Sequence, residues 1–213
     1  MPSEVIGIVD LGMGNLRSVA NAVDCCGCDP LVVADPKTIA DCSHLILPGV
    51  GSFRAASEVL HGQGFADAIR DHVAAGKPLL GTCLGMQLLL DVGSEGLDGG
   101  ATSPGLGLIP GTVERYDPGP DWRIPHVGWN SVDFVREHCL LADLKPKRDF
   151  YFVHSYHAVL ADDSCVLGRT EHGRAFVSAV AKDSVVGFQF HPEKSQANGL
   201  RLLENFCFAE ALC

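Results

Sequence analysis

The first ninety residues alternate between short apolar, β-branched runs and longer runs in which apolar residues recur at helical spacing. A strand-like run followed each time by a helix-like run indicates right-handed βαβ units, and so a parallel sheet with helices on both faces. The strand-like runs are 4–10, 31–34, 44–47 and 78–80. The helix-like runs are 16–26, 36–41, 53–75 with a break near Gly62 and Gly64, and 84–90.

The second half of the chain consists mainly of strand-like runs separated by turn residues, which predicts an antiparallel or mixed extension of the sheet. These runs are 112–116, 123–135, 150–159, 166–170, 175–181 and 185–190, followed by an amphipathic helix over 195–212. The Gly- and Pro-rich segment 93–111 joins the halves as a surface loop. We therefore predict one domain, 1–213, with a three-layer α/β fold. Its open, mixed, mostly parallel sheet carries helices on both faces and an antiparallel extension.

Composition excludes several partners. The formal net charge of −10 argues against nucleic acid, which is bound through clustered Lys and Arg. No apolar stretch approaches the ~20 residues that a membrane span needs, and the N-terminus lacks a signal-peptide pattern. Nine cysteines, an odd number, indicate reduced thiols, and the cluster at 25–28 lacks a second pair of metal ligands. We expect a cytoplasmic protein that binds no membrane and no metal.

Two glycine motifs follow strand-like runs. The first, at residues 10–17, resembles a dinucleotide-binding turn, but Arg17 occupies the place of the third small residue, so we predict no nicotinamide or flavin cofactor. The second is Gly81-Thr82-Cys83-Leu84-Gly85, in which glycines two residues either side of Cys83 allow a tight strand-to-helix turn. Such a turn exposes a nucleophile at the end of a strand, beside the N–H groups of the next helix. The alternative is a buried structural cysteine.

A thiol nucleophile needs a base, and His191-Pro192-Glu193 supplies one after a strand-like run. In an extended backbone residues i and i+2 face the same way, so Glu193 is expected to lie beside His191 and orient its ring. His44, His154 and His157 are more typical of packed or hydrogen-bonded histidines. The order Cys, His, Glu also differs from the Ser, Asp, His order of α/β-hydrolases.

At these residues the chain resembles the class I (triad) glutamine amidotransferases. The motifs "LPGVGSF", "GLGLIPG", "PHVGWN", "YFVHSYH" and "GFQFHPEKSQ" further resemble the glutaminase subunits of imidazole glycerol phosphate synthase. The resemblance implies that Cys83, His191 and Glu193 form a catalytic triad that hydrolyses glutamine through a thioester. It implies oxyanion donors at Val50 and Leu84. Residues that contact glutamine would be Gly49, Gly51, Gln87, Ser155 and Tyr156.

The resemblance also implies a partner, a (β/α)₈-barrel cyclase that receives the ammonia and forms imidazole glycerol phosphate and aminoimidazole carboxamide ribotide in histidine biosynthesis. Interface positions would be Asn15, Pro125, Trp129, Asn130, Tyr151, Lys194 and Ser195. His172 departs from the family pattern, where tyrosine is common. From the glycines flanking Val50, we predict that the oxyanion loop is not formed in the isolated chain.

Three other hypotheses stay open. The chain could serve another synthase, such as the pyridoxal phosphate or anthranilate systems. It could be a thiol hydrolase that acts alone, or a binding subunit without catalysis.

Overall fold

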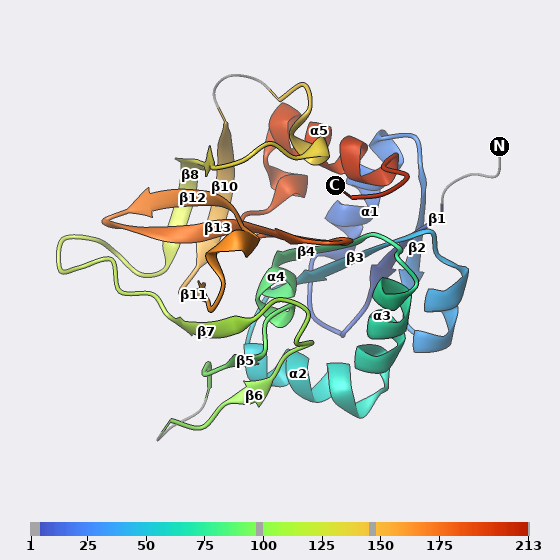
Figure 1. The fold of residues 1–213 in the computed structure, drawn as a ribbon, viewed down its shortest axis with the longest axis horizontal. Helices are drawn as coiled ribbons and strands as arrows, with labels where there is room; N and C mark the ends of the chain where they lie inside the picture. The colour runs from blue at the N-terminus through green and yellow to red at the C-terminus, as the bar shows by residue number, and fades with distance from the viewer. Residues whose placement is uncertain (1–4, 97–99, 145–147, 213) are drawn as a thin grey trace.

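The computed structural model describes residues 5–96, 100–144 and 148–212. Its centre is a parallel sheet in the order β2-β1-β3-β4-β14, and α1 and α5 lie on one face while α2 and α3 lie on the other (Figure 1). The strands are β1 (Val5–Val9), β2 (Asp29–Val33), β3 (His44–Gly49), β4 (Leu79–Cys83) and β14 (Val185–Phe188). The helices are α1 (Leu16–Cys25), α2 (Phe53–Gly62), α3 (Phe65–Ala74), α4 (Leu84–Leu88) and α5 (Gln196–Cys207), and the 3₁₀ turns are η1 (Pro36–Asp41), η2 (Cys139–Leu141), η3 (Asp163–Cys165) and η4 (Pro192–Lys194).

Beyond β14 the sheet continues through β13, β11 and β7, which pair antiparallel, to β5 and β6, and β12 joins β13 to β9. A separate two-stranded sheet is formed by β8 and β10. The strands are β5 (Val92–Gly93), β6 (Ser103–Pro104), β7 (Gly111–Arg115), β8 (His126–Ser131), β9 (Asp133–Phe134), β10 (Asp149–His154), β11 (Tyr156–Leu160), β12 (Val166–His172) and β13 (Arg174–Lys182). The predicted fold class, with its antiparallel extension, is therefore confirmed.

The apolar residues form two cores, one on each face of the sheet. One core joins the inner faces of α2, α3 and α4 to the sheet, and the other joins α1 and α5 to the sheet and to β10. Alternation of side chains along each strand sends successive residues to opposite cores, as Leu45 and Ile46 in β3 show. Because both faces are covered, the central strands are almost wholly buried, and only the strand ends can carry a site.

Several details differ from the sequence prediction. The run 123–135, expected as one strand, contains the two strands β8 and β9, and the segment 93–111, expected as a surface loop, contains β6 and the buried Leu106 and Ile109. Residues 150–159 were expected to form one strand, but the chain bends at Ser155 and forms β10 and β11 in different sheets. The helix expected over 84–90 is only five residues long. None of these differences can be read from hydrophobic periodicity, because each depends on contacts with segments that are distant in the sequence.

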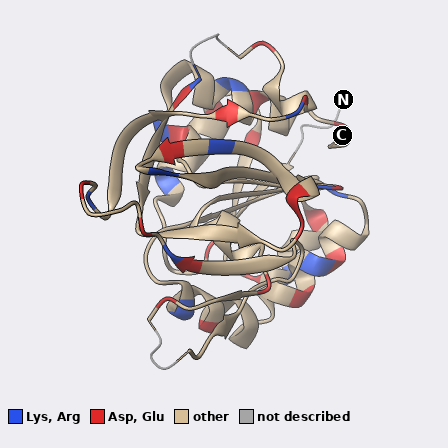
Figure 2. Cartoon of the chain, turned by 60° about the vertical axis from the view of Figure 1, so that its left-hand side comes forward, with Lys and Arg blue, Asp and Glu red and all other residues tan. Residues whose placement is uncertain are grey.

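None of the described helices is long and apolar enough to cross a membrane. On the face seen in Figure 2, Lys and Arg lie scattered among Asp and Glu.

Candidate functional site

Cys83 sits where β4 ends and α4 begins, with backbone angles of φ 54 and ψ −111 that a non-glycine residue rarely adopts. The glycines on either side make this turn possible. A Cβ on Gly81 would lie 2.7 Å from the carbonyl oxygen of Gly85, and a Cβ on Gly85 would lie 1.7 Å from the carbonyl oxygen of Leu47. The strained turn therefore requires glycine at both positions, as the motif predicted.

His191 and Glu193 lie side by side, with His191 Nδ1 2.8 Å from Glu193 Oε1 and side chains only 3% and 4% exposed. The expected contact is present, but the backbone explanation was wrong. Pro192 opens the 3₁₀ turn η4, so the two residues meet across a turn and not along an extended strand. The backbone N–H of His191 donates to the carbonyl of Tyr151 at 2.9 Å, which ties this turn to β10.

The pKa of His191 is controlled by its neighbours. Burial alone lowers it, but the neighbouring Cys83 sulfur and the hydrogen-bonded Glu193 carboxylate outweigh burial and raise the pKa to about 9. Among the described residues, none forms a hydrogen bond with the buried His191 Nε2. The imidazole is therefore protonated at neutral pH and stands ready to donate a proton beside Cys83.

A cavity of about 230 Å³ opens over Cys83. It is lined by Val50, Gly51, Cys83, Leu84, Gln87, Glu95, Val153, His154, Ser155 and Tyr156. Most of the residues expected to contact glutamine or the oxyanion thus meet in one place. Gly49 is outside the lining, but it pairs with Cys83 in the register of β3 and β4, and a Cβ there would lie 3.0 Å from Leu84 Cβ. Val50 is 38% exposed at the mouth, and the state of its loop without a partner stays a prediction.

Gln87 is buried, and its amide nitrogen donates to the carbonyl of Tyr156 and to Gln189 Oε1, both at 3.0 Å. Both N–H bonds are thereby used within the protein. Nothing in the described part of the chain donates to the Gln87 side-chain oxygen, so that oxygen is the group available to a ligand.

Glu95 is a cavity residue that the sequence analysis missed, because it lies in a segment interpreted only as a joining loop. Its Oε2 accepts from the backbone N–H of Phe53 at 2.7 Å, and burial raises the pKa of this carboxyl. The only sequence signal for this role was a carboxylate seven residues after the end of α4.

The residues expected at a partner surface divide into two groups. Trp129 and Tyr151 face each other across β8 and β10 with ring centroids 6.1 Å apart, and Lys194 Nζ lies 5.9 Å from the Tyr151 ring. Pro125 follows a cis peptide bond and is exposed, as is Asn15 at the amino end of α1. Trp129 is 49% exposed, so its ring is accessible on the surface beside Tyr151 and Lys194.

Ser195 and Asn130 differ from the others. Ser195 is 1% exposed, and its hydroxyl donates to the carbonyl of His191 at 2.6 Å and accepts from the N–H of Tyr151 at 3.0 Å. The expectation that Ser195 forms part of a surface is therefore wrong, because it is an internal brace of the histidine turn. Asn130 is half-buried and donates to the carbonyl of Glu171 at 2.8 Å.

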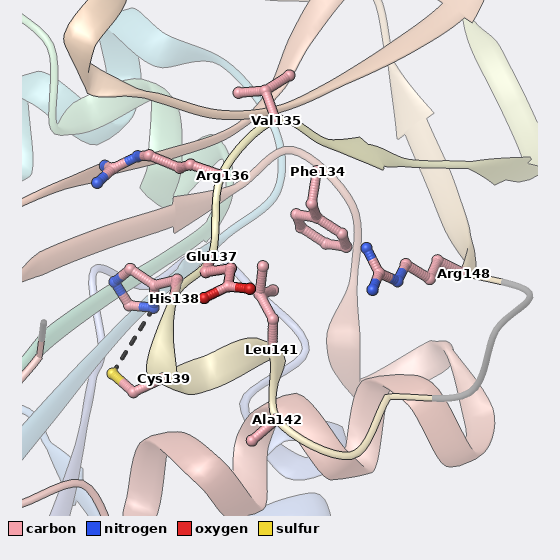
Figure 3. Close-up of a pocket in the computed structure, with 9 residues that line it drawn as sticks. All are labelled: Phe134, Val135, Arg136, Glu137, His138, Cys139, Leu141, Ala142 and Arg148. Atoms are coloured by element: carbon pink, nitrogen blue, oxygen red, sulfur yellow. Dashed lines mark hydrogen bonds between the residues drawn. The ribbon is translucent and has the colours of Figure 1, made fainter.

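A larger cavity of about 760 Å³ shares no lining residue with the Cys83 cavity and involves β9, η2 and Arg148 (Figure 3). The two arginines that line it, Arg136 and Arg148, already contact other groups of the protein. Arg136 donates to the carbonyl of Ala181 at 2.8 Å, and the Arg148 guanidinium lies 5.5 Å from the Phe134 ring centroid. None of the predicted site residues lines it.

The sequence model of the family "Glutamine amidotransferase class-I" matches residues 7–209. This chain belongs to the class I glutamine amidotransferases. Among relatives in this amidotransferase family, the imidazole glycerol phosphate synthase subunit HisH 2 of Nitrobacter winogradskyi is 45% identical, over 94% of this chain and 96% of that protein. The HisH subunit of Sulfurimonas denitrificans is 46% identical, over 95% and 97%.

Solved structures agree with an amidotransferase fold. PurLQS from Thermotoga maritima superposes with a TM-score of 0.74 at 17% identity, covering 96% of this chain and 97% of that one. A structure described as a glutamine amidotransferase has a TM-score of 0.71 at 23% identity, covering 96% and 99%. At these identities the likeness concerns the fold alone.

Proposed function

We propose that this chain hydrolyses glutamine to glutamate and ammonia at Cys83 and delivers the ammonia to the (β/α)₈-barrel cyclase subunit of imidazole glycerol phosphate synthase. The observation that carries the reaction is Cys83 on its glycine-flanked turn beside the buried His191–Glu193 pair. Support for the synthase comes from the names of relatives that match this chain over nearly its full length at 45% and 46% identity.

In the proposed reaction the Cys83 thiolate attacks the carboxamide carbon of glutamine. The N–H groups of Leu84 and Val50 donate to the oxyanion that forms. As the C–N bond breaks, His191 gives its proton to the leaving ammonia, and a thioester remains on Cys83. The neutral His191 then takes a proton from water, whose oxygen attacks the thioester and releases glutamate. Glu193 stabilises the charged imidazole at both ends of this cycle.

Glutamine carries an ammonium and a carboxylate on its α-carbon, and the cavity offers partners for both. The side-chain oxygen of Gln87 and the carboxyl of Glu95 suit the ammonium, because both are acceptors. Gly49, Gly51, Ser155 and Tyr156 supply backbone and hydroxyl groups for the carboxylate and carboxamide. The cavity of about 230 Å³ is small enough to favour one short amino acid.

Ammonia released into water at neutral pH becomes mostly ammonium, which is not a nucleophile, so the synthase must receive it through a sheltered path. We place the docking surface on Trp129, Tyr151 and Lys194, with Pro125, Asn130 and Asn15 at its edges. Exposed aromatic side chains of this kind are typical interface anchors. We also propose a cytoplasmic location and a single domain, 1–213.

Cys83→Ala tests the proposal. In the presence of the cyclase partner, synthase activity with glutamine should vanish, while activity with added ammonium salt should persist. Glutamine-dependent activity in Cys83→Ala would contradict the proposed nucleophile. Copurification with a synthase other than a histidine-pathway barrel would contradict the proposed partner, and turnover of peptides or esters without any partner would favour a thiol hydrolase.

A further inference from the structure

Two buried histidines, His126 and His154, connect the proposed partner surface to the glutamine cavity. They lie opposite each other in the register of β8 and β10, and they are 3% and 5% exposed. His126 Nδ1 lies 3.0 Å from His154 Nε2. The proposed catalytic steps use neither residue.

Asn130, His126, His154 and the Tyr156 carbonyl form a series of hydrogen bonds, and the direction of each bond can be deduced from the Tyr156 end. His154 Nδ1 lies 2.9 Å from the carbonyl oxygen of Tyr156, which can only accept, so Nδ1 carries the proton. His154 Nε2 must then accept, and the donor is His126 Nδ1. His126 Nε2 is in turn an acceptor, and Asn130 Nδ2 lies 3.4 Å from it. All three donors therefore point inward, from the sheet surface to the Tyr156 carbonyl.

The buried surroundings keep both rings neutral, as this arrangement requires. Burial lowers the pKa of His154 to about 3 and that of His126 to about 4. The ring of His126 is also held in place by stacking, with Phe152 at 4.9 Å and His172 at 4.1 Å between centroids. His172, the departure from the family pattern, thus packs on the histidine chain.

The series of hydrogen bonds reaches the cavity at the Tyr156 carbonyl. It accepts a second hydrogen bond from Gln87 Nε2 at 3.0 Å, so both of its lone pairs are engaged. Gln87 Nε2 also donates to Gln189 Oε1, and Gln189 Nε2 lies 3.9 Å from Cys83 Sγ. A displaced Tyr156 carbonyl would release Gln87, whose side-chain oxygen is the group offered to glutamine.

We propose that His154 and His126 are positioning residues of the glutaminase, which hold the Tyr156 carbonyl and, through it, the Gln87 side chain in the orientation that binds glutamine. The inference rests on the proposed function. His154 borders the cavity, but both of its ring nitrogens are engaged inside the protein, so it acts through Tyr156 and not by hydrogen bonding to substrate.

The test compares His154→Asn with His154→Gln in the complex with the cyclase partner. The Asn amide lies near the position of Nδ1 and can keep the donor to Tyr156, whereas the Gln amide reaches the position of Nε2 and loses it. His154→Gln should raise KM for glutamine about tenfold, the cost of a lost buried hydrogen bond, with kcat changed less than about threefold. His154→Asn should stay within about threefold of the wild-type KM, and the ammonia-dependent reaction should be unchanged in both.

A second measurement does not depend on activity. Long-range ¹H–¹⁵N NMR of the wild-type chain should find the Nδ1–H tautomer of both His154 and His126 at pH 7. An Nε2–H tautomer at His154 would overturn this inference but not the proposed function. Equal KM values for His154→Asn and His154→Gln in an active enzyme would do the same. A wild-type complex without glutaminase activity would overturn the proposed function and the inference with it.

Discussion

Replacing Glu193 with Gln tests the charge state of His191, because it removes a negative charge while keeping the size of the side chain. Glu193 Oε1 lies 2.8 Å from His191 Nδ1, and with side chains 3% and 4% exposed, little water screens the pair. In the wild type, burial lowers the pKa of His191, but the neighbouring Cys83 sulfur and the Glu193 carboxylate raise it to about 9.

The size of the effect follows from that pKa. A rise from 6.5 to about 9 corresponds to about 3 kcal/mol in favour of the protonated ring. A raised histidine pKa stabilises the folded state fully below pH 6.5, and this stabilisation is lost as the pH rises towards 9. The Gln oxygen still accepts from Nδ1 but carries no charge, so we expect the pKa to fall by about one unit or more and kcat to fall about 10²-fold.

The assay is an NMR titration of the His191 ring together with urea unfolding between pH 6 and 9. Wild-type stability should decline over this range, and Glu193→Gln should show a smaller decline. Asp163→Asn is the matched control, because it removes one carboxylate at a side chain that is 87% exposed. The reasoning is refuted if His191 titrates at the same pH in the wild type and in Glu193→Gln.

Three further predictions concern the turn, the partner surface and acid stability. Gly85→Ala should destabilise the fold by more than about 3 kcal/mol in urea unfolding, because its Cβ would lie 1.7 Å from Leu47 O. Gly62→Ala is the control and should not destabilise the fold, because no atom of the described residues lies within 4 Å of its added Cβ. Trp129→Ala should weaken cyclase binding in calorimetry at least tenfold, with thermal stability of the isolated chain nearly unchanged. His72 is neutral in the fold because burial lowers its pKa to about 4, so stability should fall as the pH drops from 6.5 to 4. His72→Gln should make that decline smaller without abolishing it, because His126 and His154 contribute to it as well.

Much of the fold and the central chemistry could be predicted locally. Apolar periodicity located β1 to β4 and the helices between them, since strands buried on both faces and helices packed on them need apolar residues at regular positions. Gly81 and Gly85 predicted the turn at Cys83 because no other residue fits there. His191 and Glu193 are two residues apart, so their contact needed no knowledge of distant packing, although the backbone between them proved to be a turn.

Other features depend on packing between segments that are distant in sequence. Ser195 was expected on the surface but braces the turn of His191 against β10, and Glu95 entered the cavity from a loop whose path no periodicity describes. His126 and His154 meet only because β8 and β10 pair in one register.

The amino-acid sequence by itself determined the order of elements, the strained cysteine turn and the histidine–carboxylate pair, because each rests on steric or spacing rules that act within a few residues. Only the tertiary structure decided which polar side chains surround Cys83 and in which direction their hydrogen bonds run. Those depend on strand register and on the bend at Ser155, where burial forces each donor to find the one acceptor that the neighbouring strand presents.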